Sequence, residues 1–158
     1  MKIIAIDPGF ERLGIAILEK NLHEKEKVIF SECFKTSSKD PFSKRLGEIG
    51  EHVRLLIKKY KPEALSIETL YFSTNQKTII TVAEARGVML YEAARAGLPI
   101  YEYTPLQVKI AVTGYGKSDK KGVIDMVRKL VNVDKDKASD DEFDAIAIGL
   151  CCLASMRN

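Results

Sequence analysis

Short apolar runs separated by brief polar turns predict that the chain begins with three β-strands. The runs cover Lys2–Asp7, Arg12–Glu19 and Lys27–Phe34. The first connection holds Pro8 and Gly9, and the second is mostly charged. Short connections of this kind between apolar runs are typical of an antiparallel meander.

A helical periodicity replaces the strand pattern after residue 40. Asp40 is predicted to cap this helix, with Pro41 at its first helical position. Apolar side chains then recur at the spacing of one helix face: Phe42, Leu46, Ile49, Val53, Leu56 and Tyr60. Pro62 marks the end of the helix.

The second half of the chain alternates between short strands and helices before ending in helices alone. Strands are predicted over residues 63–68 and 99–103. Between them lies a long helix, Gln76–Ala96, which a glycine and a proline bring to an end. Three further helices are predicted: Pro105–Val112, Asp119–Val131 and Asp140–Ser155. Because no repeat, low-complexity tract or linker interrupts this order, we expect one α/β domain over residues 1–158.

The composition is that of an ordinary globular protein and changes this picture little. The 158 residues are 46% apolar, and 25 basic against 22 acidic residues give a net charge of +3, which does not demand a nucleic-acid partner. No apolar run reaches the ~18 residues of a membrane span. The first strand starts too early for a signal peptide, so a cytoplasmic protein is expected. The three cysteines, Cys33, Cys151 and Cys152, lack metal-site spacing and are interpreted as small core residues.

Acidic side chains stand at the ends of two predicted strands. Asp7 and Glu68 each follow a run of apolar strand residues. In open α/β sheets, sites form at the carboxyl ends of strands, so these two carboxylates would meet if their strands are neighbours. The alternative is that each acid simply faces water at a strand end. A buried carboxylate, by contrast, is costly unless it is paired or coordinates a metal.

Two more acids mark the start of the last predicted helix. Ser139 and Glu142 fit a capping box, and acids are common in the first turn of any helix, which accounts for Asp140, Asp141 and Glu142 without a function. Asp141 and Asp144 lie three residues apart, so they share one helix face about 5–6 Å from each other. Apolar residues continue that face, which is therefore expected to point at the sheet. Asp144 lies too deep in the helix to be explained as a cap.

Four converging carboxylates would repel one another unless a cation neutralised them. Oxygen ligands suit Mg²⁺, with Mn²⁺ as a substitute. Two such ions ~3.5–4 Å apart can support phosphodiester hydrolysis. No other catalytic motif competes, because His23 and His52 are interpreted as solvated or structural and no phosphate-binding loop or dinucleotide fingerprint occurs.

A basic segment and an aromatic pair are candidates for nucleic-acid binding. Cationic residues gather near Gly114 and Gly116: Lys109, Lys117, Lys120, Lys121, Arg128 and Lys129. Such residues contact phosphates, although an ordinary solvated face is the alternative. Tyr71 and Phe72 closely follow Glu68, where they could stack on unpaired bases or simply pack a loop.

Taken in order, these motifs resemble those of the RuvC family of Holliday-junction resolvases, which have a ribonuclease-H-like fold. The resemblance runs through "IDPGFERLG", "SIETLYFSTN", "AEARG", "YEYTPLQVKIAVTGYG", "KSDKKGVIDMV" and "DEFDAIAIG". It implies a mixed five-stranded sheet, with three antiparallel strands and then two parallel ones, flanked by helices.

The resemblance also implies roles for individual residues. Four carboxylates would hold the metal: Asp7, Glu68, Asp141 and Asp144. Lys109 and Lys120 would lie near the cleaved phosphate, with Lys120 as a catalytic residue, and Tyr71 would intrude on bases at the junction centre. The implied DNA contacts are Tyr71, Phe72, Asn75, Arg86, Lys109, Lys117, Lys120 and Lys121.

The implied activity is that of a Mg²⁺-dependent, structure-selective endonuclease. It would make paired symmetric nicks in four-way DNA junctions during recombination and repair, with two Mg²⁺ ions in each active site. The implied partners are a second copy of the chain and the branch-migration motor complex RuvA-RuvB.

Other functions fit the sequence less well. An RNA-processing nuclease of the YqgF type shares the opening motif, but the complete second motif and the lysine-rich segment count against it. A non-catalytic DNA-binding module would have no use for four acids that face DNA. A phosphotransferase of the sugar-kinase type needs two lobes, for which 158 residues are too few.

Overall fold

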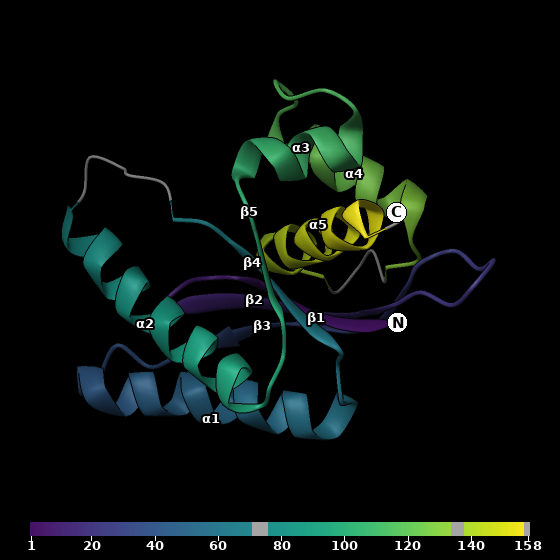
Figure 1. Ribbon diagram of the computed structural model, residues 1–158. Helices are drawn as coiled ribbons and strands as arrows, with labels where there is room; N and C mark the ends of the chain where they lie inside the picture. The colour runs from purple at the N-terminus through teal and green to yellow at the C-terminus, as the bar shows by residue number, and fades with distance from the viewer. Residues whose placement is uncertain (71–75, 134–137, 157–158) are drawn as a thin grey trace.

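A five-stranded mixed sheet forms the centre of the structure (Figure 1). The computed structural model describes residues 1–70, 76–133 and 138–156. The strands are β1 (Lys2–Asp7), β2 (Arg12–Glu19), β3 (Lys27–Lys35), β4 (Ala64–Glu68) and β5 (Ile100–Tyr103), in the spatial order β3-β2-β1-β4-β5. The first three strands pair antiparallel, whereas β4 runs parallel to β1 and β5 runs parallel to β4. The predicted sheet is therefore confirmed.

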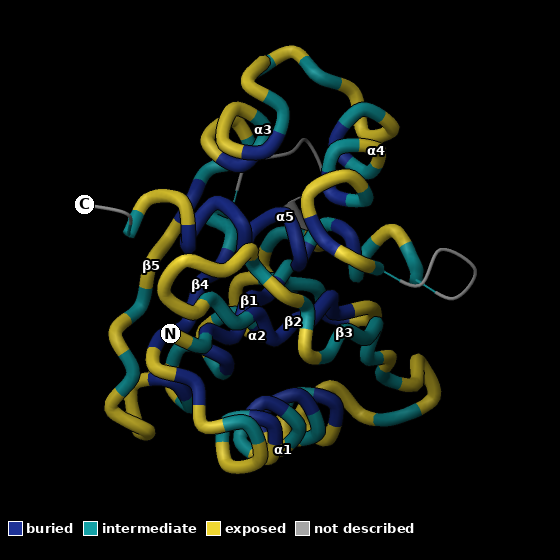
Figure 2. Tube along the Cα trace, turned by 90° about the vertical axis from the view of Figure 1, so that its right-hand side faces the viewer, coloured by how far each residue is buried: buried dark blue, intermediate teal, exposed yellow. Residues whose placement is uncertain are grey.

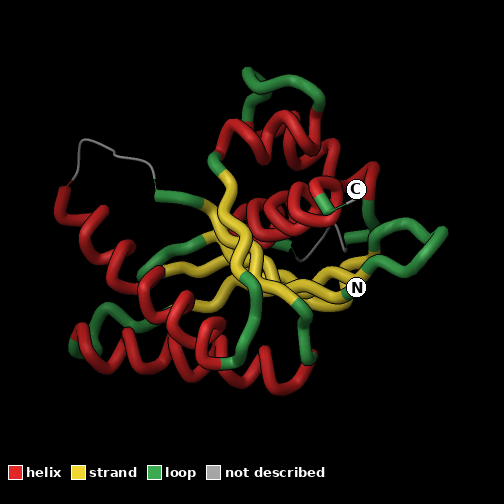
Figure 3. Tube along the Cα trace, viewed as in Figure 1, coloured by secondary structure: helices red, strands yellow, loops and turns green. Residues whose placement is uncertain are grey.

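Helices cover both faces of this sheet. Those in the described residues are α1 (Phe42–Tyr60), α2 (Gln76–Arg95), α3 (Pro105–Thr113), α4 (Lys120–Leu130) and α5 (Asp140–Ser155). α1 and α2 lie on one face, and α5 lies on the other with α3 and α4 stacked outside it (Figures 1 and 3). None of these helices is long and apolar enough to cross a membrane.

β1 is buried on both faces, and its alternate side chains belong to two separate cores. Ile3 and Ala5 pack in the core beneath α5, whereas Ile4 and Ile6 pack in the core beneath α1 and α2. Figure 2 shows the central strands of the sheet and the inner sides of the helices as the buried part of the fold. Asp7 thus ends a strand that is held on both sides, so its position is fixed by the core.

The start of α1 differs from the sequence-based prediction. The helix begins at Phe42, and Pro41 stands before it in an extended conformation with φ −57° and ψ 147°. Asp40 makes no cap, because its carboxylate accepts a hydrogen bond from Lys44 Nζ at 2.8 Å. The predicted cap at Asp40, with Pro41 as the first helical residue, is therefore wrong. The other predicted elements agree with the structure to within about two residues at each end.

Gly14 lets α5 approach the sheet closely. It lies opposite Asp7 in the β1–β2 pairing. A Cβ atom at this position would lie 2.1 Å from the carbonyl oxygen of Asp141 and 3.3 Å from the Cβ atom of Asp7. Only a glycine therefore permits the first turn of α5 to sit against the end of β1.

Gly14→Ala should damage this approach. We expect a loss of about 1–3 kcal/mol of unfolding free energy, because a backbone carbonyl cannot step aside as a flexible side chain can. Gly47→Ala is the matched control, since a Cβ atom at Gly47 meets nothing within 4 Å and the change favours the helix. Urea unfolding of the two variants measures the difference, and equal stability would contradict the close approach.

Candidate active site

The predicted carboxylates of β1 and β4 are brought to the same edge of the sheet. β1 and β4 are parallel neighbours, and Ile6 pairs with Ile67, so the next residues are Asp7 and Glu68. Both side chains are only partly exposed. The sequence-based expectation that the two strand ends lie side by side is confirmed.

The first turns of α5 bring two further acids to this edge. Ser139 caps the helix, since the Glu142 amide donates to its hydroxyl and its own amide donates to the Glu142 carboxylate at 2.9 Å. The capping box is therefore confirmed. Glu142 also accepts a hydrogen bond from Ser31 Oγ at 2.7 Å, so it belongs to the helix cap. Asp141 and Asp144 lie beside it on a face directed toward Asp7.

Burial and the charges of neighbouring acids together change the pKa values of these carboxylates. Burial and the charges of Asp144, Glu68 and Asp141 together raise the pKa of Asp7 to about 8. Burial and the charge of Asp144 raise the pKa of Glu68 to about 7, against an opposing effect of Lys109. Each shift means that the ionised form is disfavoured in the folded protein.

The two acids of α5 each have a cationic partner. Lys120 Nζ lies 3.0 Å from Asp144 Oδ2 and 3.5 Å from Asp140 Oδ2. Burial nevertheless raises the pKa of Asp144, with Lys120 opposing the shift. At Asp141, burial also raises the pKa, but hydrogen bonds from Arg12 and Cys33 outweigh it and the net pKa is lowered.

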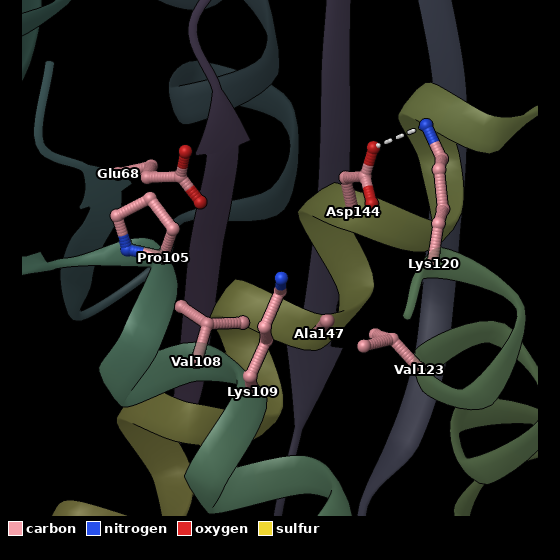
Figure 4. Close-up of a pocket in the computed structure, with 8 residues that line it drawn as sticks. All are labelled: Glu68, Pro105, Val108, Lys109, Lys120, Val123, Asp144 and Ala147. Carbon is pink, nitrogen blue, oxygen red and sulfur yellow. Dashed lines mark ion pairs between the residues drawn. The ribbon is translucent and has the colours of Figure 1, made fainter. Parts of the chain in front are cut away.

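A cavity of about 240 Å³ opens between these groups (Figure 4). Glu68 and Asp144 face it from β4 and α5, while Lys109 and Lys120 reach into it from α3 and α4. Apolar side chains form its remaining wall: Pro105, Val108, Val123 and Ala147. A cavity with acids on one side and ammonium groups on the other can hold a cation together with a phosphate.

The residues present suit a hard divalent cation. The four acids at the edge offer carboxylate oxygens as metal ligands. A bound cation would offset the burial and the repulsion that disfavour ionised Asp7 and Glu68. Within the described ranges, no three acidic, histidine or cysteine side chains are already drawn together as a finished cation site. Arg12 and Lys120 account for this, because they draw Asp141 and Asp144 toward themselves.

Two predicted cationic contacts have partners within the protein. Arg86 Nε donates to the backbone carbonyl of Glu68 at 3.0 Å, and its guanidinium also bonds the Glu102 carboxylate. Its side chain is only 13% exposed, so it holds the end of β4 in place. Arg128 stacks over the ring of Phe143, with 4.9 Å between its Cζ atom and the ring centroid.

The remaining predicted residues divide into three groups. Lys117 and Lys121 are exposed, as a phosphate contact requires. His23 is exposed, and His52 stacks on Phe34 and bonds Glu32, so neither histidine lies at the site and that interpretation is confirmed. Tyr71, Phe72 and Asn75 lie outside the described residues, so their contacts stay predictions.

Arg12 and Cys33 are the site residues that sequence reasoning missed. Cys151 and Cys152 are buried as expected, but Cys33 is half-buried and its thiol donates to Asp141 Oδ2 at 3.3 Å. The interpretation of Cys33 as a core residue is therefore wrong. The signal that could have revealed them is the strand register. Gly14 on β2 pairs with Cys33 on β3, and Arg12 lies two residues before Gly14 on the same strand.

Comparisons with known proteins identify the family of the chain. The family model described as crossover junction endodeoxyribonuclease RuvC matches residues 3–152. A relative of that name from Thermosipho melanesiensis is 46% identical over 157 residues, which cover 99% of each chain. Another from Alkaliphilus metalliredigens is 46% identical over 151 residues, covering 96% of this chain and 92% of the relative.

A solved structure extends the agreement to three dimensions. RuvC of T. thermophilus in complex with a Holliday junction substrate superposes with a TM-score of 0.93 at 32% identity, covering 99% of this chain and 95% of that one. The predicted ribonuclease-H-like fold is thus confirmed. Both the predicted motifs and these matches extend over nearly the whole chain, which therefore belongs to the RuvC family of crossover junction endodeoxyribonucleases.

Proposed function

We propose that this chain cuts four-way DNA junctions with divalent cations held by Asp7, Glu68, Asp141 and Asp144. The RuvC family is a family of metal-dependent nucleases. The observation that carries the proposal is the convergence of these acids at one edge of the sheet, where burial and then the charges of Asp144, Glu68 and Asp141 raise the pKa of Asp7 to about 8. The metal we propose is Mg²⁺, two ions per site, with Mn²⁺ as a substitute.

The cationic side chains would act on the phosphate. Divalent cations bound at the four acids would supply an activated water molecule and stabilise the leaving oxygen. With Asp144 as a cation ligand, Lys120 would be released from its 3.0 Å contact with Asp144 and would keep only Asp140 at 3.5 Å, so its ammonium could stabilise charge on the phosphate. Lys109 faces the same cavity beside Glu68.

The exposed lysines would carry the sequence-independent part of DNA binding. Lys117 and Lys121 are exposed and lie close to Lys120 in the sequence. Phosphate contacts by such side chains release counterions, so binding should weaken as salt rises. Tyr71, Phe72 and Asn75 are proposed to reach the bases at the junction centre, and action together with RuvA-RuvB in recombination and repair is proposed from the family alone.

Cleavage of a synthetic four-way junction tests the proposal directly. Wild type with Mg²⁺ should cut the junction and leave a linear duplex and an RNA–DNA hybrid intact. Asp144→Asn should abolish cutting while junction binding survives, because a metal ligand is lost and repulsion toward DNA falls. Full activity in Asp144→Asn would contradict the metal assignment, and selective cutting of the hybrid would favour an RNA-processing nuclease.

Two neighbouring lysines separate catalysis from binding in the same assay. Lys120→Ala should lower the cleavage rate at a saturating concentration of junction DNA much more than it lowers the affinity for the junction. Lys121→Ala is the matched control, since it should chiefly weaken binding and flatten its salt dependence. If Lys120→Ala changed affinity alone, Lys120 would have no catalytic role.

Asp7→Asn should stabilise the metal-free protein at high pH. Folding raises the pKa of Asp7 from 3.8 to about 8 and that of Glu68 from 4.5 to about 7. A folded state that binds protons more tightly than the unfolded chain loses stability as pH rises between the two pKa values. Wild type in EDTA should therefore lose stability between about pH 4 and pH 8. Asp7→Asn should melt several degrees higher than wild type at pH 8 and little higher at pH 5.

The same melting curves report on the cation. Mg²⁺ should raise the Tm of wild type most at pH 8, where the acids are ionised and repel each other, and should raise that of Asp7→Asn much less. A wild-type protein in EDTA whose stability did not fall between pH 5 and pH 8 would contradict the unfavourable charge at Asp7.

We also propose that the chain works as a two-fold homodimer through α2. Ala85, Met89 and Ala93 bury one face of this helix in the core. The opposite face is exposed, with Ile80 at 60% and Tyr91 at 61% and the small residues Ala83 and Gly87 between them. Two related sites would supply the paired cuts, and two-fold dimers are the commonest oligomers.

Ile80→Glu should disrupt this dimer. A charge on this apolar helix face would have to be buried without a partner, so association should weaken by roughly 10-fold or more. Sedimentation velocity at micromolar concentration measures it, with Leu55→Glu on the exposed face of α1 as the matched control. Wild type that stays monomeric in the presence of junction DNA would overturn the dimer.

A further inference from the structure

Two side chains from neighbouring strands bind the same oxygen of Asp141. Arg12 Nε donates to Asp141 Oδ2 at 2.8 Å, and the Nη2 group of Arg12 bonds the same atom. The thiol of Cys33 donates to Oδ2 at 3.3 Å. These three donors leave the second carboxylate oxygen, Oδ1, to other partners.

The register of the sheet places all these groups on one face. Arg12 and Gly14 are two residues apart on β2, so their side-chain directions agree, and Gly14 is the cross-strand partner of Cys33 on β3. Because Gly14 has no side chain, the backbone of Asp141 comes against β2 between Arg12 and Cys33. The contact is therefore set by the register of the sheet and by the close approach of α5 to Gly14.

We infer that Arg12 and Cys33 are positioning residues that hold Asp141 ready to bind a cation. The inference rests on the proposed role of Asp141 as a metal ligand. A carboxylate held by three donors on one oxygen has lost its rotamer freedom before the cation arrives, and it keeps Oδ1 for coordination. Groups that orient a ligand in this way typically contribute 10–100-fold to metal affinity.

Arg12 could instead oppose the cation, since both carry positive charge. The side chain of Arg12 is 51% exposed, so solvent screens its repulsion of a cation. Its hydrogen bonds to Oδ2, by contrast, act at short range and are charge-assisted. The orienting effect therefore outweighs the repulsion, and removing Arg12 weakens cation binding.

Mn²⁺ binding to the DNA-free protein tests the inference without any turnover. Isothermal titration should show about tenfold weaker binding for Arg12→Ala and an intermediate value for Arg12→Lys, which keeps one donor. Cys33→Ala should weaken binding a few-fold, whereas Cys33→Ser, whose hydroxyl still donates, should stay near wild type. Rescue by the conservative variants separates positioning from a general loss of structure.

A matched control comes from the surface of α1. Arg54 donates Nε and Nη2 to the Glu51 carboxylate at 2.8 and 2.6 Å, so Arg54→Ala removes a similar ion pair away from the site. It should leave Mn²⁺ affinity unchanged. Melting in EDTA shows that each variant is folded before titration.

The outcomes distinguish this inference from the proposed function. If Asp141→Asn binds Mn²⁺ like wild type, Asp141 is not a ligand and both claims fail. If Asp141→Asn loses affinity while Arg12→Ala and Cys33→Ala keep it, only the positioning role fails. Tighter binding by Arg12→Ala would overturn the inference in favour of competition between Arg12 and the cation.

Discussion

The repulsion between four carboxylates at one edge of the sheet is the constraint on which the rest of the site depends. Burial, and then the charges of the three other acids, raise the pKa of Asp7 to about 8, so the fold disfavours the ionised form of this carboxylate. The fold keeps Asp7 in place because β1 is buried on both faces, where Ile4 and Ile6 face one core and Ile3 and Ala5 the other. The apolar core thus stabilises an arrangement that its acids alone would not adopt.

Different contacts hold the individual acids in place, and the residues that make these contacts come from distant parts of the chain. Glu68 is fixed through its backbone, since Arg86 of α2 bonds its carbonyl and Thr69 continues the ladder to Tyr103. Asp141 can approach the end of β1 because Gly14 has no side chain at the point of contact. The change from antiparallel to parallel pairing at β1 makes this possible, because it puts the end of β4 beside the end of β1.

Local pattern in the sequence predicted the elements and the acids but could not predict the partners of the acids. Strand alternation, helical spacing and the Ser139 cap are properties of neighbouring residues, so they are visible in the sequence. The contacts of Arg12, Cys33, Arg86 and Arg128 join elements far apart in the chain, and a basic or small residue looks the same whether it faces solvent or a carboxylate. The wrong cap at Asp40 has a local origin, since Pro41 suits either the first helical position or the residue before it.

The two cationic side chains that pair with the acids of α5, Arg12 from β2 and Lys120 from α4, differ in a way that suits different tasks. Arg12 places two donors on one oxygen of Asp141, and this fork is a fixed, directional contact. Lys120 is a single ammonium group shared between Asp140 and Asp144 on a flexible stem that is 53% exposed. A contact of the second kind is readily exchanged when a cation takes Asp144 and a phosphate enters the cavity. A contact of the first kind can persist on Oδ2 while Oδ1 takes up a ligand. The first turns of α5 therefore carry two different carboxylates. Asp141 keeps its contact with Arg12 when a cation binds, whereas Asp144 exchanges its contact with Lys120 for the cation.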